Sequence, residues 1–298
     1  MKKINGISRS RADKAFDILD YILLTIAFLL VAYPLYFVVI ASVSDPTAVY
    51  EGRVLLYPIK PTLEGYARIF SYDSLFVGYK NTLIYAVIGT AINVVLTVTA
   101  GYALSRKELV GRNVMMMGVM FTMIFSGGTI PNYPLVRSLG LYNTIWSLIL
   151  PAAISTYYMI ILKSFFSSLP ESLEEAATID GANDFQILVR IYLPLSLASL
   201  ATITLFYAVF RWNRFDDALY YIQDRNLYPL QLKLYNAIKN TQQVDLTAMQ
   251  EGSTAVANNI SQSIESATII FATLPILVVY PFVQRYFVSG VTIGAVKG

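Results

Sequence analysis

The chain has 298 residues, of which 56% are hydrophobic and only 14% charged, and its mean hydropathy is +0.55. This balance excludes an ordinary soluble domain and is typical of a protein in a lipid bilayer. The formal net charge is only +3, and the scattered basic residues exclude nucleic acid as a partner.

The sequence contains neither cysteine nor histidine. Disulfides, thiolate nucleophiles, zinc sites of the usual kind and histidine acid/base catalysis are therefore excluded. We predict that the chain has no catalytic residue and no metal site.

Six apolar runs are long enough to cross about 30 Å of hydrocarbon as helices. They lie at residues 19–43, 82–104, 114–130, 144–166, 193–210 and 267–287. The basic residues before the first run resemble the start of a signal peptide, but the run is too long for the apolar part of one. We therefore predict an all-α membrane protein with six transmembrane helices in a single domain, residues 1–298.

Lysine and arginine near the ends of the spans predict which loops face the cytoplasm. The amino-terminal tail is basic, and the short loop between the second and third spans carries Arg106, Lys107 and Arg112. Both are expected on the cytoplasmic side, and six spans place both termini there as well. The segments expected outside are 44–80, 131–143 and 211–266.

The loop at residues 167–192 is cytoplasmic by alternation, and its acidic character does not oppose this, because acidic residues count little in the rule. Pro170 suits the first position of a helix, and three glutamates follow it near the favourable end of the helix dipole. This helix is expected to end at Gly181, since glycine readily takes the left-handed conformation that closes a helix. A second short helix would span 184–192 until Pro194 interrupts it. These residues alone are compatible with a docking knob or with a plain solvated hairpin.

The same segment matches the whole EAA signature of ATP-binding-cassette importer permeases. The matching residues are Glu175, Ala176, Ala177, Asp180, Gly181, Ile191, Leu193 and Pro194. The six expected spans, the large outer segment and the ending YFVSGVTIGAVKG resemble the MalG-type subunits of carbohydrate importers. The stretch MFTMIFSGGTIPNYPLVRSLGLYNT is most similar to the LplC/YtcP-type permeases. The chain thus resembles the carbohydrate-uptake class, with the type I ABC importer permease fold.

This resemblance implies a permease subunit that moves an oligosaccharide, or a fragment of a complex polysaccharide, inward across the bacterial cytoplasmic membrane. The implied partners are a second homologous permease subunit, an ATP-binding-cassette ATPase dimer and an extracytoplasmic solute-binding protein. Glu175 would contact the ATPase, Ala176 and Ala177 would permit close packing, and Gly181 would set the angle between two coupling helices. The tail at 294–298 would reach the ATPase dimer, with a frayed end as the alternative.

The sequence contains no nucleotide-binding loop of the form GxxxxGK[ST]. We therefore predict that the chain is not an enzyme and binds no cofactor, and that ATP and magnesium belong to the partner ATPase. Two alternatives stay open: the same importer class carrying a non-sugar solute, and an ion-coupled secondary carrier. The second is disfavoured because such carriers place ionisable groups inside their spans, and none lies well inside the six expected here.

Sugars present apolar ring faces edged by hydroxyls, which suit aromatic side chains combined with amides and hydroxyls. On this ground the predicted substrate path includes Asn93, Thr202, Phe206, Trp212 and Asn213. With 13% aromatic residues, many rings must serve the membrane interface or helix packing instead. The outer segment 211–266 is too long for a plain connection. By resemblance it would meet the solute-binding protein, and a folded cap over the outer mouth is the alternative.

Overall fold

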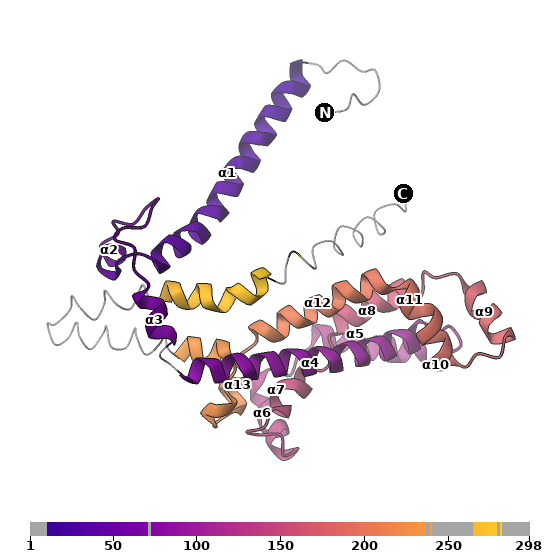
Figure 1. Cartoon of the computed structure of the whole chain (residues 1–298). Helices are drawn as coiled ribbons and strands as arrows, with labels where there is room; N and C mark the ends of the chain where they lie inside the picture. Colours follow the sequence, from indigo (N-terminus) through magenta and orange to yellow (C-terminus); the bar gives the residue numbers. More distant parts are fainter. Residues whose placement is uncertain (1–10, 71–72, 237–238, 240–264, 279–280, 282–298) are drawn as a thin grey trace. The chain divides into compact units, whose positions relative to one another are not determined.

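The structure is a computed structural model that describes residues 11–70, 73–236, 239, 265–278 and 281. Within these ranges every regular element is a helix and no strand is present (Figure 1). The all-α class predicted from the sequence is therefore confirmed. Packing divides the chain into two compact units, one of residues 1–71 and 238–271 and the other of residues 72–237 and 272–298.

The first unit contains the long apolar helix α1 (Arg11–Ser42), which exposes most of its apolar side chains. Such a surface suits a helix surrounded by lipid. The short helix α2 (Pro46–Tyr50) is capped by Asp45, whose carboxylate accepts hydrogen bonds from the amides of Thr47 and Ala48 at 2.9 and 3.1 Å. The end of α1 and α2 share a small core, and α3 (Glu64–Phe70) follows.

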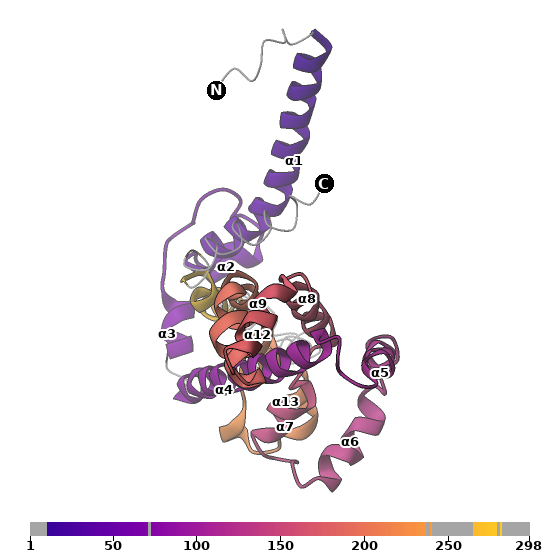
Figure 2. The same cartoon turned by 90° about the vertical axis from the view of Figure 1, so that its right-hand side faces the viewer.

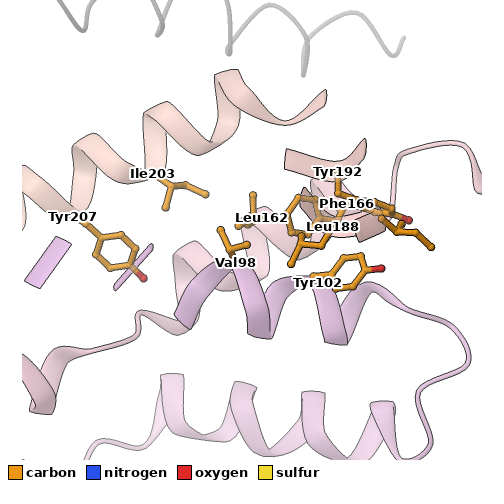
Figure 3. Packing of buried hydrophobic residues seen from close by; sticks show 9 residues of the cluster. Val98, Tyr102, Leu162, Phe166, Leu188, Tyr192, Ile203 and Tyr207 are labelled. Carbon is orange, nitrogen blue, oxygen red and sulfur yellow. The ribbon is translucent and has the colours of Figure 1, made fainter. Parts of the chain in front are cut away.

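The second unit is built around α4 (Asp73–Ser105), which packs along both α8 (Thr156–Phe166) and α12 (Leu197–Asn213) (Figure 1). A core of buried apolar side chains joins these helices to the segment that precedes α12 (Figure 3). Its members are Val98, Tyr102, Leu162, Phe166, Ile187, Leu188, Tyr192, Ile203 and Tyr207. The loop that carries the EAA signature is thus anchored in the main core of this unit.

Two helices, α1 and α4, are each long and apolar enough to cross a membrane. Three further stretches reach that length only as bent helix pairs, so the described residues offer up to five spans. The pair α5 (Arg112–Ile124) and α6 (Thr129–Ser138) bends by 116°, which Figure 2 shows as α6 running steeply away from α5. The apolar helix at Glu265–Val278 begins the sixth expected span, but most of its continuation lies outside the described residues. The count of six is therefore not confirmed.

The expected span at 114–130 is interrupted, since α5 ends at Ile124 and the glycine pair that follows favours a turn. The span at 144–166 is also broken, with a bend of 50° between Trp146–Ala152 and α8. The first part of that pair is α7 (Trp146–Ile149) with the 3₁₀ turn η1 (Leu150–Ala152). Continuous apolar composition therefore did not mean a continuous helix.

The expected fifth span, 193–210, differs at both ends. It starts within α11 (Leu193–Leu195), and the stretch Asp184–Leu195 meets α12 at 87°. At the other end α12 continues to Asn213. Arg211, expected at the start of the outer segment, therefore lies inside the helix.

The described start of the expected outer segment is folded, with α13 (Asp216–Tyr221) and the 3₁₀ turn η3 (Arg225–Leu227). Two side chains of α4 donate hydrogen bonds to the segment that follows α13. The Asn81 amide donates to the carbonyl of Tyr228 at 3.1 Å, and the Tyr85 hydroxyl donates to that of Leu227 at 2.9 Å. Residues 240–264 lie outside the described part.

Candidate functional site

The first helix of the EAA loop is α9 (Glu171–Ile179). Pro170 is its N-cap rather than its first residue, one position from the prediction. The helix ends in a Schellman motif, in which the amide of Gly181 donates to the carbonyl of Thr178 and that of Ala182 to Ala177. Gly181 has φ +80°, and a Cβ there would meet nothing within 4 Å. The backbone conformation, not lack of space, therefore favours glycine, as the sequence predicts.

The second helix of the loop begins at α10 (Asp184–Ile187). A capping box starts it: the Asn183 side-chain oxygen Oδ1 accepts from the Gln186 backbone amide at 2.9 Å, and the Gln186 side-chain oxygen accepts from the Asn183 backbone amide at 3.0 Å. The chain then widens into a π turn, η2 (Leu188–Tyr192), and continues through Pro194 as α11 to Leu195. The predicted interruption at Pro194 is therefore wrong: the widened turn accommodates a residue that lacks a backbone N–H, and the bend follows α11.

The predicted coupling residues differ in exposure. Those exposed to solvent are Glu175, Ala176, Asp180, Gly181 and Pro194, and those half-buried are Ala177, Ile191 and Leu193. Ala177, Asp180, Gly181 and Ile191 line one open depression of about 410 Å³ between the two helices. Ala182, Gln186 and Arg190 complete its lining. The structure thus brings four of the eight predicted residues together around one hollow.

Four residues of this region were not among the predicted site residues. Arg106, directly after α4, forms an ion pair with Glu174 of α9, and the Tyr192 hydroxyl donates to the other Glu174 oxygen at 2.8 Å. The Arg106 guanidinium also lies over the ring of Tyr102, 5.5 Å from its centre. Burial opposes the charge on Arg106, but the surrounding negative groups outweigh this and raise its pKa. The available signal was charge: a basic loop and an acidic loop are both expected on the cytoplasmic side.

The five residues predicted for the substrate path occupy different environments. Asn93 is fully buried, and its amide donates to the carbonyl of Ala152 at 2.7 Å. The Thr202 hydroxyl donates to a carbonyl of its own helix, and the Asn213 amide does the same. Phe206 stacks on Tyr158. Asn93 therefore holds the fold together in this state rather than facing open space.

The indole of Trp212, the fifth of these residues, is half-buried. Its N–H donates to the carbonyl of Ala272 at 3.3 Å, and its ring meets that of Tyr79 edge-on at 5.9 Å. The structure does not gather the five predicted path residues around either of the two hollows described in this part of the chain, the depression at the EAA loop and a cavity of about 20 Å³ beside Arg211.

A buried arginine, which was not among the predicted path residues, forms four hydrogen bonds within the helix bundle. Arg211 is 5% exposed, and its Nε donates to the side-chain oxygen of Asn93 at 2.8 Å. Its remaining hydrogen bonds go to the carbonyls of Leu148, Ile149 and Ala152 at 2.7 to 2.9 Å. These carbonyls lie at the end of α7 and η1, where a helix leaves acceptors unpaired and favours a positive charge. Sequence reasoning missed this role because Arg211 lies one residue beyond the expected span.

Among the described residues, no group of three or more aspartate or glutamate side chains could hold a metal ion. What the EAA loop offers chemically is an exposed acidic helix, small side chains and an open hollow, which suit contact with another protein.

Known proteins match this chain over nearly its whole length. The permease protein YtcP of the polygalacturonan/rhamnogalacturonan transport system of Bacillus subtilis (strain 168) is 41% identical over 288 residues, 96% of this chain and 99% of that protein. Protein LplC of the same organism is 39% identical over 298 residues, 100% of both chains. The resemblance to LplC/YtcP-type permeases is therefore confirmed.

A solved structure confirms the expected fold. A chain of a bacterial ABC transporter involved in the import of the acidic polysaccharide alginate superposes with a TM-score of 0.84 at 33% identity, covering 95% of this chain and 100% of that one. The family model described as "Binding-protein-dependent transport system inner membrane component" matches residues 7–293. The chain thus belongs to the family of inner membrane components of binding-protein-dependent transport systems.

Proposed function

We propose that the chain is the transmembrane permease subunit of an ATP-driven importer for oligosaccharides. As a member of its family it is a multi-pass membrane protein and a transport subunit rather than an enzyme. The observation that carries the proposal is full-length similarity to a permease named for polygalacturonan and rhamnogalacturonan, and to a chain of an alginate importer. Fragments of complex polysaccharides are therefore the substrate class that we propose.

Energy would enter through the EAA loop, by contact between α9 and an ATPase. The exposed carboxylate of Glu175 and the small side chains of Ala176 and Ala177 support this role. Ile179 and Phe185, on either side of the turn at Gly181, are 86% and 71% exposed. Large apolar side chains exposed this far outside the spans fit a protein interface. Asp180, Ile191, Leu193 and Pro194 would keep the two helices at the angle that the ATPase meets.

The family works with ATPase and substrate-binding protein partners. We propose a second homologous permease subunit and an ATPase dimer that holds ATP and magnesium, because this sequence lacks the phosphate-binding GxxxxGK[ST] loop. An extracytoplasmic solute-binding protein would deliver the sugar. Both termini would face the cytoplasm of the bacterial cell, since the loop with Arg106 and Lys107 is basic.

For the substrate path we retain Asn93, Thr202, Phe206, Trp212 and Asn213 as proposed contacts. The half-buried rings of Phe206 and Trp212 suit the apolar faces of sugars. Asn93 would contribute only in a state in which its present hydrogen bonds are released, because the amide and the carbonyl oxygen both have protein partners.

The test is uptake of labelled oligogalacturonides by vesicles that contain this chain with the second permease, the ATPases and the solute-binding protein. Uptake should require hydrolysable ATP and should survive collapse of the proton and sodium gradients. An ion-coupled carrier would show the opposite dependence. Saturating uptake by this chain alone, without any ATPase present, would overturn the proposal.

A further inference from the structure

The two loops expected on the cytoplasmic side are joined by a cluster of charged and aromatic side chains. Arg106 belongs to the first of these loops, and Glu174 belongs to α9 in the second. Arg106 pairs with one oxygen of Glu174, and the hydroxyl of Tyr192 donates to the other at 2.8 Å. A second nitrogen of Arg106 lies 3.6 Å from the carboxylate of Asp184, at the start of α10. One guanidinium therefore connects the end of α4 to both helices of the EAA loop.

This ion pair is shielded, whereas its neighbour in the same two loops is not. The side chains of Arg106 and Glu174 are 18% and 17% exposed. Those of Lys107 and Glu171, which also form an ion pair, are 73% and 65% exposed. Solvent and salt screen an exposed pair strongly and a shielded one much less. The Lys107–Glu171 pair is therefore a matched control for the Arg106–Glu174 pair.

Three aromatic rings, those of Tyr102 in α4, Phe166 in α8 and Tyr192 in η2, pack together in the core beside this pair (Figure 3). The ring of Tyr192 meets that of Tyr102 edge-on at 5.1 Å and that of Phe166 at 5.5 Å. Edge-to-face rings at these separations attract one another beyond simple burial. The residue that donates to Glu174 is thus itself held between two membrane helices.

We propose that Arg106, Glu174 and Tyr192 form a latch that makes the first cytoplasmic loop and the EAA loop move as one body. This inference rests on the proposed function. Without the latch, a push on α9 would reach α4 only through the chain connections, the packing of Ala177 against the core and the exposed Lys107–Glu171 pair, and the turn at Gly181 would absorb part of it. With the latch, the same push reaches α4 directly. Arg106 is then a positioning residue for the coupling of ATP hydrolysis to transport.

The first test compares uptake per ATP hydrolysed in the reconstituted complex. Arg106→Gln and Glu174→Gln should each lower this ratio at least about fivefold, a typical size for coupling between sites. The double variant should be about as impaired as the more impaired single variant, because the Arg106–Glu174 contact is already lost in each of them. Arg106→Lys, which keeps the charge, should recover at least half of the wild-type ratio, and Lys107→Gln should stay within about twofold of it.

Three outcomes separate the inference from the function beneath it. A wild-type complex without ATP-dependent uptake overturns the proposed function, and the latch with it. A wild-type complex that works, together with an Arg106→Gln variant that behaves like Lys107→Gln, overturns the latch alone. Multiplicative losses in the double variant also overturn it.

A second test leaves Arg106, Glu174 and Tyr192 unchanged, so it does not depend on the stability of those variants. It uses introduced cysteines, because the chain has none of its own that would react. Lys107→Cys and Glu171→Cys place thiols on the exposed pair, and a short cleavable bis-thiol reagent joins them in a complex with cysteine-free partners. Since the two loops move together, uptake and ATP hydrolysis should remain within about twofold of the uncrosslinked protein. Transport that stops on crosslinking and returns on cleavage would show that the loops must separate, which overturns the latch.

Discussion

Arg211 shows how a single charged side chain is accommodated among apolar helices. Its described hydrogen bonds go to Asn93 and to carbonyls at the ends of α7 and η1, just before the break that precedes α8, and not to a carboxylate. Without Arg211 these carbonyls would lose a charged donor in an apolar surrounding, which is costly, although that of Ala152 would still accept from Asn93. The side chain also passes directly over Gly89 of α4, where a Cβ would lie 2.8 Å from its Nε. One residue therefore explains both the tolerated break and a glycine on another helix.

Arg211→Ala should destabilise the protein by about 3 kcal/mol or more, because it removes the donors for several buried acceptors. Gly89→Ala should destabilise the wild-type protein by about 1–3 kcal/mol through overpacking. In the Arg211→Ala background the same change should be nearly neutral, since the clashing atoms are gone. Thermal unfolding of all four proteins in detergent measures this cycle. Simply additive losses would contradict the close approach of Gly89 to Arg211.

Gly181→Asp should leave the protein inserted but lower the ATPase stimulation by substrate. The left-handed backbone at φ +80° disfavours any other residue by about 1 kcal/mol, and aspartate adds a negative charge to the hollow. Gly181→Asn is the matched control, because asparagine has nearly the same shape, tolerates this conformation and carries no charge. A stimulation equal to that of wild type in Gly181→Asp would count against a role of this turn in coupling.

At the scale of single helices, the ends of α9 and α10 follow local rules that the sequence carries. The acidic first turn of α9, its closing glycine and the capping box at Asn183 each depend on residues within one turn. These ends were predicted to within one or two residues. The bends within the spans were not predicted, because a hydropathy average depends only on composition and carries no information on the direction of the helix axis. At the 87° bend, the buried Ser196 hydroxyl donates to the carbonyl of Tyr192 at 2.6 Å, a contact that composition does not reveal.

Asn183→Ala should destabilise α10 by about 1 kcal/mol, because the side chain no longer accepts from the Gln186 amide. Hydrogen exchange at the amides of 186–188 should become faster, while exchange in α4 should not change. Asn183→Asp keeps a cap acceptor and should exchange like the wild-type protein. Equal acceleration in both variants would mean that the cap is not what holds this helix.

For the whole molecule, the orientation in the membrane can be tested with single cysteines in this cysteine-free chain. Lys107→Cys should react with an impermeant thiol reagent only from the cytoplasmic side, and Tyr220→Cys only from outside, since both positions are exposed. Gly298→Cys should react only from the cytoplasmic side if six spans are present. Labelling of that position from outside would indicate an odd number of spans.

By itself, the sequence determined the membrane setting, the all-α class, the family and three of the four helix ends of the EAA loop. Each depends on composition or on residues close together in the chain, so no distant contact is needed to find them. Only the tertiary structure decided that Glu174, next to the signature residue Glu175, forms an ion pair with Arg106. It also decided that Arg211 donates to the carbonyls just before the break between η1 and α8. In both cases a polar group shielded from solvent must find its partner across more than 60 residues of chain. Which partner it finds depends on how the helices pack, because burial makes an unpaired polar group costly wherever the fold places it.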